Sequence, residues 1–297
     1  MMSISAVFRS MRIPFLALTF ACVFLGASTA VANDITVSLP LLMLALLGAL
    51  LAHISVNTLN EYFDFKSGLD LETVRTQFSG GSGALPQNPE MVNTVLVIGV
   101  VSSVIIFMIG SFFVWQYGVE IIPTGLIGLV IIATYTGWIN RHPFICLVAP
   151  GIGFGLLMVT GTSFVLQGEF TMLSWLVAVI PFFLVNNLLL LNQYPDIQAD
   201  LNAGRNHFPI AYGVRHSSFV YGLFVLATVL SIIALVVAGY LPILSLIALL
   251  PIPLALFSLF GAIKYGETIG SQPQYLGANV AVSILTPFLL GVSLILR

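Results

Sequence analysis

Two short polar stretches of the chain combine amide and carboxylate side chains at a repeated spacing. Each contains an asparagine, an aspartate four residues later and a further aspartate beyond: Asn60, Asp64 and Asp70 in the first, and Asn192, Asp196 and Asp200 in the second. Residues four apart share one face of a helix, so the second set is predicted to form a single helical stripe. Gly68 is predicted to end or bend the first helix, which lets Asp70 turn back from the following loop.

Such a set of carboxylates favours a bound cation, because unpaired aspartates that face one another raise each other's pKa. Oxygen-only ligands suit Mg²⁺, which one or two carboxylates typically hold together with phosphate oxygens of a substrate. We therefore expect Mg²⁺ as cofactor, with Asp64, Asp70, Asp196 and Asp200 as its ligands. Four basic side chains are expected to contact a bound diphosphate, namely Lys66, Arg75, Arg141 and Arg205. Each also has an adequate explanation as a charge that sets membrane topology.

The elements that position these side chains are membrane helices. Of the 297 residues, 59% are hydrophobic and 7% are charged, whereas soluble proteins carry about 25% charged residues. This composition excludes an ordinary cytosolic enzyme, a nucleic-acid-binding protein and a disordered chain. A helix needs about 20 apolar residues to cross the hydrocarbon core. Nine such stretches are predicted to form an all-α polytopic bundle around a central cavity: 13–32, 39–59, 92–116, 119–138, 144–166, 171–192, 217–239, 242–263 and 275–296.

The basic residues predict the orientation of this bundle. With a cytoplasmic N-terminus, eight of the nine Lys and Arg residues fall in inside segments, and only Arg297 lies outside. Both polar stretches follow even-numbered spans, so both are predicted to face the cytoplasm from a bacterial or archaeal inner membrane. The first span also resembles a cleavable signal peptide, with Arg9 and Arg12 before an apolar run that ends at Ala30-Val31-Ala32. Its greater length favours a retained helix.

These features resemble the UbiA superfamily of intramembrane prenyltransferases. Asn60-x3-Asp64 with Asp70, and Asp196-x3-Asp200 followed by Gly204-Arg205, resemble its two aspartate-rich motifs. Nine helices with motifs after the second and sixth are also similar to the family. The resemblance covers residues 1–297 as one domain, with motif loops at about 60–91 and 192–216.

Three smaller features bear on the branch of the superfamily. Arg12-Ile13-Pro14 and Tyr135-Thr136 resemble recurrent family sequences, and Tyr135 is expected to face the reacting centre. The run from Asn60 to Asp70 most resembles the menaquinone branch, which prenylates 1,4-dihydroxy-2-naphthoate. Glu61 stands where Asp is frequent in that branch, and Pro195 where a basic residue is frequent, so the acceptor stays open.

The resemblance implies Mg²⁺-dependent transfer of a polyprenyl group from its diphosphate to an aromatic acceptor. It implies catalytic roles for Asn60, Asn192 and Tyr135 beside the aspartates, although the asparagines also suit helix caps or interhelical hydrogen bonds. The expected partners are polyprenyl diphosphate, the acceptor and membrane lipid, with no nucleic acid and no obligate protein partner. Other acceptors remain open: 4-hydroxybenzoate, haem, chlorophyllide or a glyceryl phosphate.

Two functions of other classes also remain. A secondary transporter or channel uses intramembrane acids, although near the bilayer midplane rather than at one face. A transferase of cytidine-diphosphate alcohols has a late Asp-x3-Asp, but its Asp-Gly and Ala-Arg strings are missing from this sequence. The glycine-rich run Ser79–Gly83 is expected to let its loop close over a site, or to form a phosphate nest. His53 is expected to bond between helices, and His142, His207 and His216 to lie at the interface.

Overall fold

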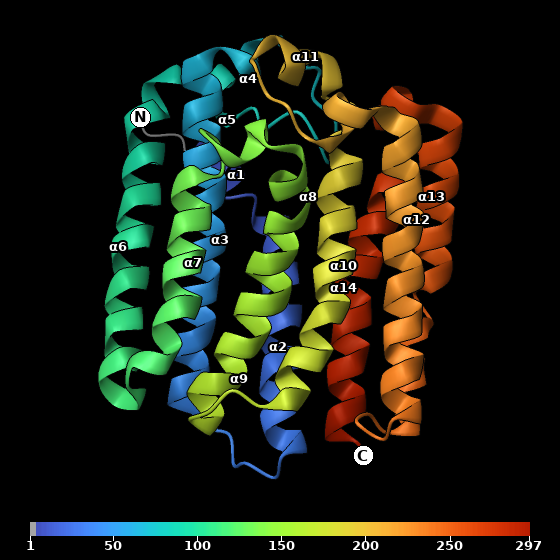
Figure 1. Ribbon diagram of the computed structural model, residues 1–297. Helices are drawn as coiled ribbons and strands as arrows, with labels where there is room; N and C mark the ends of the chain where they lie inside the picture. Colours follow the sequence, from blue (N-terminus) through green and yellow to red (C-terminus); the bar gives the residue numbers. More distant parts are fainter. Residues whose placement is uncertain (1–3) are drawn as a thin grey trace.

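The computed structural model describes residues 4–297, and every regular element in that range is a helix (Figure 1). The long helices are Leu16–Ala32 (α2), Leu39–Ser67 (α3), Val92–Tyr117 (α6), Met172–Asn192 (α10), Phe208–Val237 (α12) and Pro273–Ile295 (α14), and α12 is kinked at Gly213, where φ is 78°. A further segment runs as Pro143–Gly151 (α8), the π-helix Ile152–Met158 (η5) and Val159–Gln167 (α9), and another as the 3-10 helix Ile243–Leu249 (η6) and Ile252–Tyr265 (α13).

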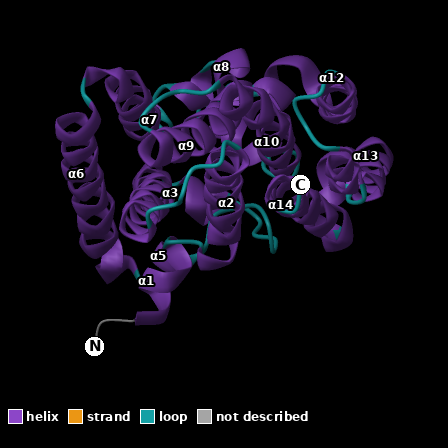
Figure 2. Ribbon diagram, turned by 90° about the horizontal axis from the view of Figure 1, so that it is seen from below, coloured by secondary structure: helices purple, strands orange, loops and turns teal. Residues whose placement is uncertain are grey.

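The remaining elements are short. They are Ile4–Ser10 (α1), Ile13–Phe15 (η1), Leu69–Glu72 (α4), Ala84–Gln87 (α5), Pro89–Met91 (η2), Val119–Ile121 (η3), Ile122–Thr134 (α7), Ile139–Arg141 (η4), Ile197–Asn202 (α11) and Gly266–Ser271 (η7). Seen along the bundle, α6 and α7 lie at one side and α12 and α13 at the other, with α2 and α10 between them (Figure 2).

Eight helical segments in the described part of the chain are long and apolar enough to cross a bilayer. The predicted fourth span, 119–138, holds instead the shorter apolar helix Val119–Thr134, which runs beside α6 (Figure 1). Sixteen helical residues rise only about 24 Å, less than the roughly 30 Å of a typical hydrocarbon core. Helix α3 continues to Ser67, beyond the predicted start of the first motif loop. Helix α12 begins at Phe208, but its backbone is not helical at Gly213, near the predicted end of the second motif loop.

Local breaks shape the inside of the bundle. Pro150 interrupts the helical hydrogen bonding of its segment, and the next amide, of Gly151, donates to Asn186 Oδ1 at 2.6 Å. A methyl group at Gly155 would overlap the backbone of Phe182, so glycine there allows the segment to pack closely on α10. The chain passes from Gly151 into the π-helix η5, whose side chains line a cavity described below.

Buried polar side chains hold the other half of the bundle together. Tyr221 donates its hydroxyl to Asn279 Oδ1 at 2.8 Å, and Asn279 Nδ2 donates to the Asn187 carbonyl at 3.0 Å. Asn187 Nδ2 closes the ring by donating to the Tyr221 carbonyl at 2.9 Å. These three residues join α10, α12 and α14. Such interhelical hydrogen bonds stabilise helix pairs within a bilayer, where lipid tails are as apolar as the helices and burial of apolar side chains does not drive association.

Candidate active site

The first polar stretch is positioned by the end of α3. Asn60 and Asp64 lie on this helix, one turn apart. Gly68 adopts φ 84° and ends α3, as predicted, because glycine occupies the left-handed region without a Cβ penalty. The short helix α4 then turns Asp70 back into the protein, where Asp70 is only 4% exposed.

The second stretch does not form the predicted continuous stripe. Helix α10 ends at Asn192, the chain turns through Gln193–Asp196, and α11 begins at Ile197. Pro195 explains the break, because its ring and missing N–H cannot continue the helix. Asp196 precedes the first residue of α11, and Asp200 donates its backbone N–H to the Asp196 carbonyl at 2.8 Å. Helices α4 and α11 therefore meet at one end of the bundle (Figure 1).

Arg205 joins the two stretches directly. Its Nη1 donates to Asp200 Oδ1 at 2.8 Å, and its Nη2 donates to Asp64 Oδ1, 141 residues away in sequence. Burial alone would lower the pKa of Arg205, but the Asp64 and Asp200 carboxylates outweigh it and raise that pKa. The guanidinium is thus a fixed positive charge between the motifs.

His207 is a residue whose place the sequence did not reveal. The prediction of an interfacial side chain is wrong, because His207 is 1% exposed and its Nε2 lies 2.9 Å from Asp200 Oδ2. Together with Arg205 it fixes both oxygens of that carboxylate. Residues 203–206 separate it from α11 without a helical period, so no spacing pattern connected it to Asp200.

The glycine-rich loop contacts both motifs. The Gly80 N–H donates to Asp196 Oδ2 at 2.9 Å. A Cβ at Gly81, whose φ is +72°, would lie 2.6 Å from Asp70 Oδ1, so the loop backbone packs directly against that carboxylate. In this conformation the loop closes the acidic site from one side, with a glycine against one aspartate of each motif.

Glu61 anchors the same loop. It is 1% exposed and accepts hydrogen bonds from the Ser82 N–H, at 3.1 Å, and from the Ser82 hydroxyl. This residue was noted in the sequence only as a departure from the menaquinone branch. The structure assigns the glutamate a contact with the loop rather than with the other motif.

Several oxygen atoms of this site suit a divalent cation. Within residues 4–297, the buried Oδ2 of Asp70, Oδ1 of Asp196 and Oδ1 of Asn192 have no hydrogen-bond partner. Burial, with the nearby Glu61 and Asp64 charges, raises the pKa of Asp70 to about 8. Burial and the Asp200 charge raise the pKa of Asp196 to about 7. These unpaired carboxylate and amide oxygens fit Mg²⁺, which would accept them as ligands, and its charge would lower the raised pKa values of the two aspartates.

The protein ligands do not form a complete metal cage. Across the described chain, no three His, Cys, Asp or Glu side chains come close enough to hold one ion by themselves. Two of the four predicted ligands, Asp64 and Asp200, form ion pairs with Arg205. This arrangement fits a cation such as Mg²⁺, which retains water and takes part of its coordination from substrate phosphate.

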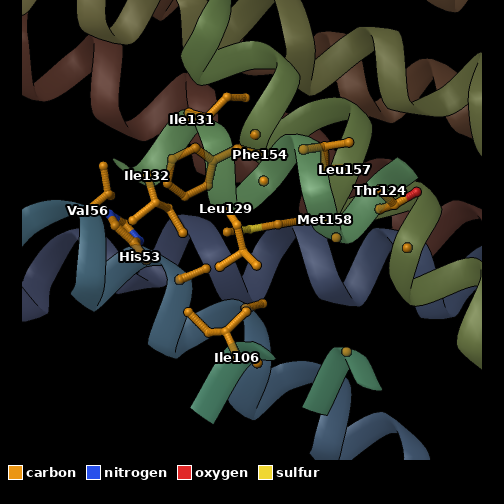
Figure 3. Close-up of a pocket in the computed structure, with 18 of the residues that line it drawn as sticks. His53, Val56, Ile106, Thr124, Leu129, Ile131, Ile132, Phe154, Leu157 and Met158 are labelled. Atoms are coloured by element: carbon orange, nitrogen blue, oxygen red, sulfur yellow. The ribbon is translucent and has the colours of Figure 1, made fainter. Parts of the chain in front are cut away.

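An apolar cavity of about 680 Å³ begins beside the acidic site. Its polar lining includes Arg12, Asn60, Tyr135 and Asn192, and the rest comes mainly from aliphatic and aromatic side chains of α3, α6, α7, η5 and α10. Figure 3 shows His53, Leu129, Phe154 and Met158 around this main cavity.

His53 makes the interhelical bond predicted for it. Its Nδ1 is 2.9 Å from the Thr19 hydroxyl, and its ring packs edge-on against Phe154 with centroids 4.7 Å apart. The imidazole thereby joins α3 to α2 and forms part of the cavity wall.

The other predicted diphosphate-binding residues lie elsewhere. Lys66 is exposed, with its Nζ 6.0 Å from the centroid of the Tyr62 ring, and Arg141 is exposed in η4. Arg75 lines a second cavity together with Arg9 and Arg12. Among the four predicted cations, Arg205 is the one that the structure places in contact with the aspartates.

The fold and the site define a polytopic helical protein with an acidic, cation-compatible site at the mouth of an apolar cavity. The UbiA prenyltransferase family matches residues 18–268, so the chain belongs to this family of integral membrane prenyltransferases. It is 28% identical over 224 residues to the 1,4-dihydroxy-2-naphthoate octaprenyltransferase of Bacillus subtilis, covering 74% of this chain and 70% of that protein.

Solved structures share the fold. A UbiA homolog from Archaeoglobus fulgidus bound to DMAPP and Mg²⁺ has a TM-score of 0.65 and 18% identity, covering 96% of this chain and 99% of that one. The apo UbiA homolog from Aeropyrum pernix K1 has a TM-score of 0.67 and 19% identity, covering 94% and 97%. The predicted superfamily is confirmed.

Proposed function

We propose that this chain transfers a polyprenyl group from its diphosphate to 1,4-dihydroxy-2-naphthoate or a related quinone precursor, with Mg²⁺ as cofactor. The observation that carries the proposal is the meeting of both aspartate motifs and the glycine-rich loop at the polar mouth of an apolar cavity. The naphthoate preference is supported by the name of the Bacillus subtilis relative, and the use of Mg²⁺ by the Archaeoglobus fulgidus complex.

The residues divide between the two ends of the prenyl diphosphate. Asp70, Asp196 and Asn192 would hold Mg²⁺ through their unsatisfied oxygens. When bound, Mg²⁺ supplies positive charge that stabilises the departing diphosphate. Arg205 adds a fixed positive charge, and the Asp64 and Asp200 carboxylates orient it. Lys66, Arg75 and Arg141 are assigned weaker roles toward the diphosphate, since none of them forms an ion pair with an aspartate among the described residues.

The apolar cavity holds the isoprenoid chain and excludes water from the reacting carbon. Each buried CH₂ contributes about 0.8 kcal/mol. The C–O bond to the diphosphate breaks with its electron pair on the leaving group, and an acceptor ring carbon forms the new C–C bond. That ring carbon then loses a proton, or CO₂ where a carboxylate occupied the position. Asn60 and Tyr135 line the cavity near its polar mouth, which supports their assignment as residues that would face this carbon.

We further propose a single domain with nine crossings, a cytoplasmic N-terminus and the acidic site on the cytoplasmic face of a bacterial or archaeal inner membrane. Helix α1 and the end of α14 lie toward opposite ends of the bundle (Figure 1), which supports an odd number of crossings. The short helix α7 would be the ninth crossing, with local thinning of the bilayer accommodating its length.

The test is prenyl transfer by the purified full chain, with farnesyl diphosphate, 1,4-dihydroxy-2-naphthoate and MgCl₂, followed by mass spectrometry. Asp70→Asn and Asp196→Asn should each lower kcat by about 100-fold or more, whereas Glu120→Gln, an exposed acid in η3, should not. Wild-type turnover in folded Asp70→Asn and Asp196→Asn would refute the assignment. A panel with 4-hydroxybenzoate and glyceryl phosphate tests the acceptor, and failure to consume any prenyl diphosphate would favour a transporter.

A further inference from the structure

The 3-10 turn η4 joins α7 to α8 and carries a buried asparagine. Asn140 is 5% exposed, whereas the following Arg141 is exposed. An amide that has lost its contacts with water must find hydrogen-bond partners within the protein, or its burial is costly. The partners of Asn140 connect it to three segments around the acidic site.

The backbone of Asn140 is hydrogen-bonded on both sides. Its N–H donates to the Tyr135 carbonyl at 3.1 Å, at the end of α7. Its carbonyl accepts from the Asn206 N–H at 2.9 Å, and the preceding Arg205 N–H donates to the Asp200 carbonyl at 2.9 Å. The loop that carries Arg205 is therefore held between η4 and α11.

The side chain of Asn140 reaches the second aspartate motif through a buried thiol. Cys146, 0% exposed on α8, donates its S–H to Asn140 Oδ1 at 3.6 Å and accepts from Gln193 Nε2 at 3.3 Å. Gln193 follows Asn192 at the end of α10, and its carbonyl accepts from the Asp196 N–H at 3.2 Å. The three side chains therefore connect η4 to the turn that precedes α11.

Apolar side chains enclose this network. Cys146 belongs to a small buried cluster with Ile139 and Ala149, against which Tyr135 and Leu189 pack. Tyr135, Ala149 and Leu189 also line the main cavity, so the network lies behind the cavity wall. Because water is excluded there, removing one hydrogen-bonding group leaves its partner unsatisfied and frees the segments that it joined.

The other cysteine provides a direct comparison. Cys22 on α2 is also 0% exposed, and no hydrogen bond of its thiol is found within residues 4–297. A small apolar side chain would serve equally well at that position. The Cys146 thiol differs, because it has an acceptor on one side and a donor on the other.

We propose that Asn140 is a positioning residue for the proposed prenyl transfer. Through Cys146 and Gln193 it sets the distance between Asp196 and the loop that carries Arg205. In the proposed function these two residues act on one diphosphate, Asp196 through Mg²⁺ and Arg205 through its own charge. A misplacement of about 1 Å between such groups can lower a rate by about 100-fold. The inference rests on the proposed function and adds a network that lies behind the cavity wall.

The first experiment is steady-state prenyl transfer by the purified full chain with farnesyl diphosphate, 1,4-dihydroxy-2-naphthoate and MgCl₂. Asn140→Leu and Cys146→Ala should each lower kcat/KM for farnesyl diphosphate about tenfold and leave the acceptor KM within about twofold. Cys146→Ser keeps a donor and an acceptor at this position, so it should recover most of the loss. Cys22→Ala is the matched control and should change kcat/KM less than about twofold. Wild-type kinetics in Cys146→Ala, or an equal loss in Cys146→Ser, would overturn the proposal.

The second experiment tests whether Asn140 and Gln193 act through one connection. Asn140→Leu and Gln193→Leu each disconnect the same thiol, so the double variant should lose no more than about threefold beyond the weaker single variant. Losses that multiply would show two independent effects and overturn the proposal. Thermal unfolding of all variants separates positioning from stability, because kinetic losses that simply follow the Tm, with Cys22→Ala included, would also overturn it.

A binding measurement distinguishes the failure of this inference from the failure of the proposed function. Calorimetric titration of the full chain with inorganic pyrophosphate in MgCl₂ requires no prenyl transfer. Cys146→Ala should weaken this binding about fivefold, and Cys146→Ser should restore it. That pattern without any prenyl transfer by the wild type would retain the positioning network and reject the reaction. Normal pyrophosphate binding and normal transfer in Cys146→Ala would retain the reaction and reject the network.

Discussion

Replacing Arg205 tests whether the two motifs are held together as described. Its Nη1 and Nη2 bind Asp200 and Asp64, and the three side chains are 15%, 5% and 10% exposed. In Arg205→Gln, Asp200 keeps its contact with His207, but the Asp64 carboxylate loses the partner that the structure gives it. Leaving a buried charge unpaired destabilises a protein by about 3–5 kcal/mol. We expect the free energy of unfolding to fall by that amount.

The assay is unfolding by sodium dodecyl sulfate in mixed micelles, followed by tryptophan fluorescence. A double-mutant cycle with Asp64→Asn isolates the pair, and the double variant should exceed the additive expectation in stability by about 1.5–3 kcal/mol. Arg215→Gln, which removes an exposed arginine, should stay within about 0.5 kcal/mol of the wild type. A loss below about 1 kcal/mol in Arg205→Gln, or strict additivity in the cycle, would refute the bridge.

Three further predictions concern the loop, the cation and the cavity. Gly81→Ala should abolish most prenyl transfer, because the new Cβ would clash with the Asp70 carboxylate at a φ of +72°. Gly204→Ala, with φ +75° and open space around it, is the control for backbone strain alone. Equal losses of activity in both variants would contradict the contact between Gly81 and Asp70. Apparent Mg²⁺ affinity, measured from rates at limiting MgCl₂, should rise from about pH 6 to about pH 8, because Mg²⁺ must displace protons from Asp196 and Asp70, whose pKa values are about 7 and about 8. An apparent Mg²⁺ affinity that does not change with pH would contradict the ligand assignment. The same raised pKa values also make the protein without Mg²⁺ less stable as pH rises through them. Gly153→Leu should raise the KM for long prenyl diphosphates more than for dimethylallyl diphosphate, because it adds a side chain to open space in the main cavity; an equal change for both lengths would show that the chain lies elsewhere.

The sequence and the structure agree where the relevant signal is local. A left-handed turn at Gly68 was predictable because glycine after a helical run ends the helix in that conformation. The apolar runs predicted nine spanning helices. In the described residues eight segments are long enough, and the helix at 119–138 is shorter because the chain turns at Tyr135. The regular stripe predicted for the second motif failed at Pro195, where an i, i+4 spacing was taken as helix across a residue that breaks helices.

The contacts within the candidate site could not be predicted from the sequence. His207 beside Asp200, Glu61 beneath Ser82 and the Gly80 amide on Asp196 join residues from 7 to 116 positions apart. No periodic pattern connects such residues, since their meeting depends on how α3, α10 and α12 pack. The same packing determines where the arginines lie, with Arg205 between the two motifs and Arg75 lining the second cavity.

The sequence alone determined that this protein is built from membrane helices, because too few charged residues are present to cover a water-exposed surface. It also determined the residues with a capacity for cation and phosphate chemistry, since carboxylate, amide and guanidinium groups keep that capacity in any fold. Tertiary structure decided which groups neutralise one another and which keep free donors and acceptors. Those outcomes depend on distances across the bundle, and helix packing sets these distances only after the whole chain has folded.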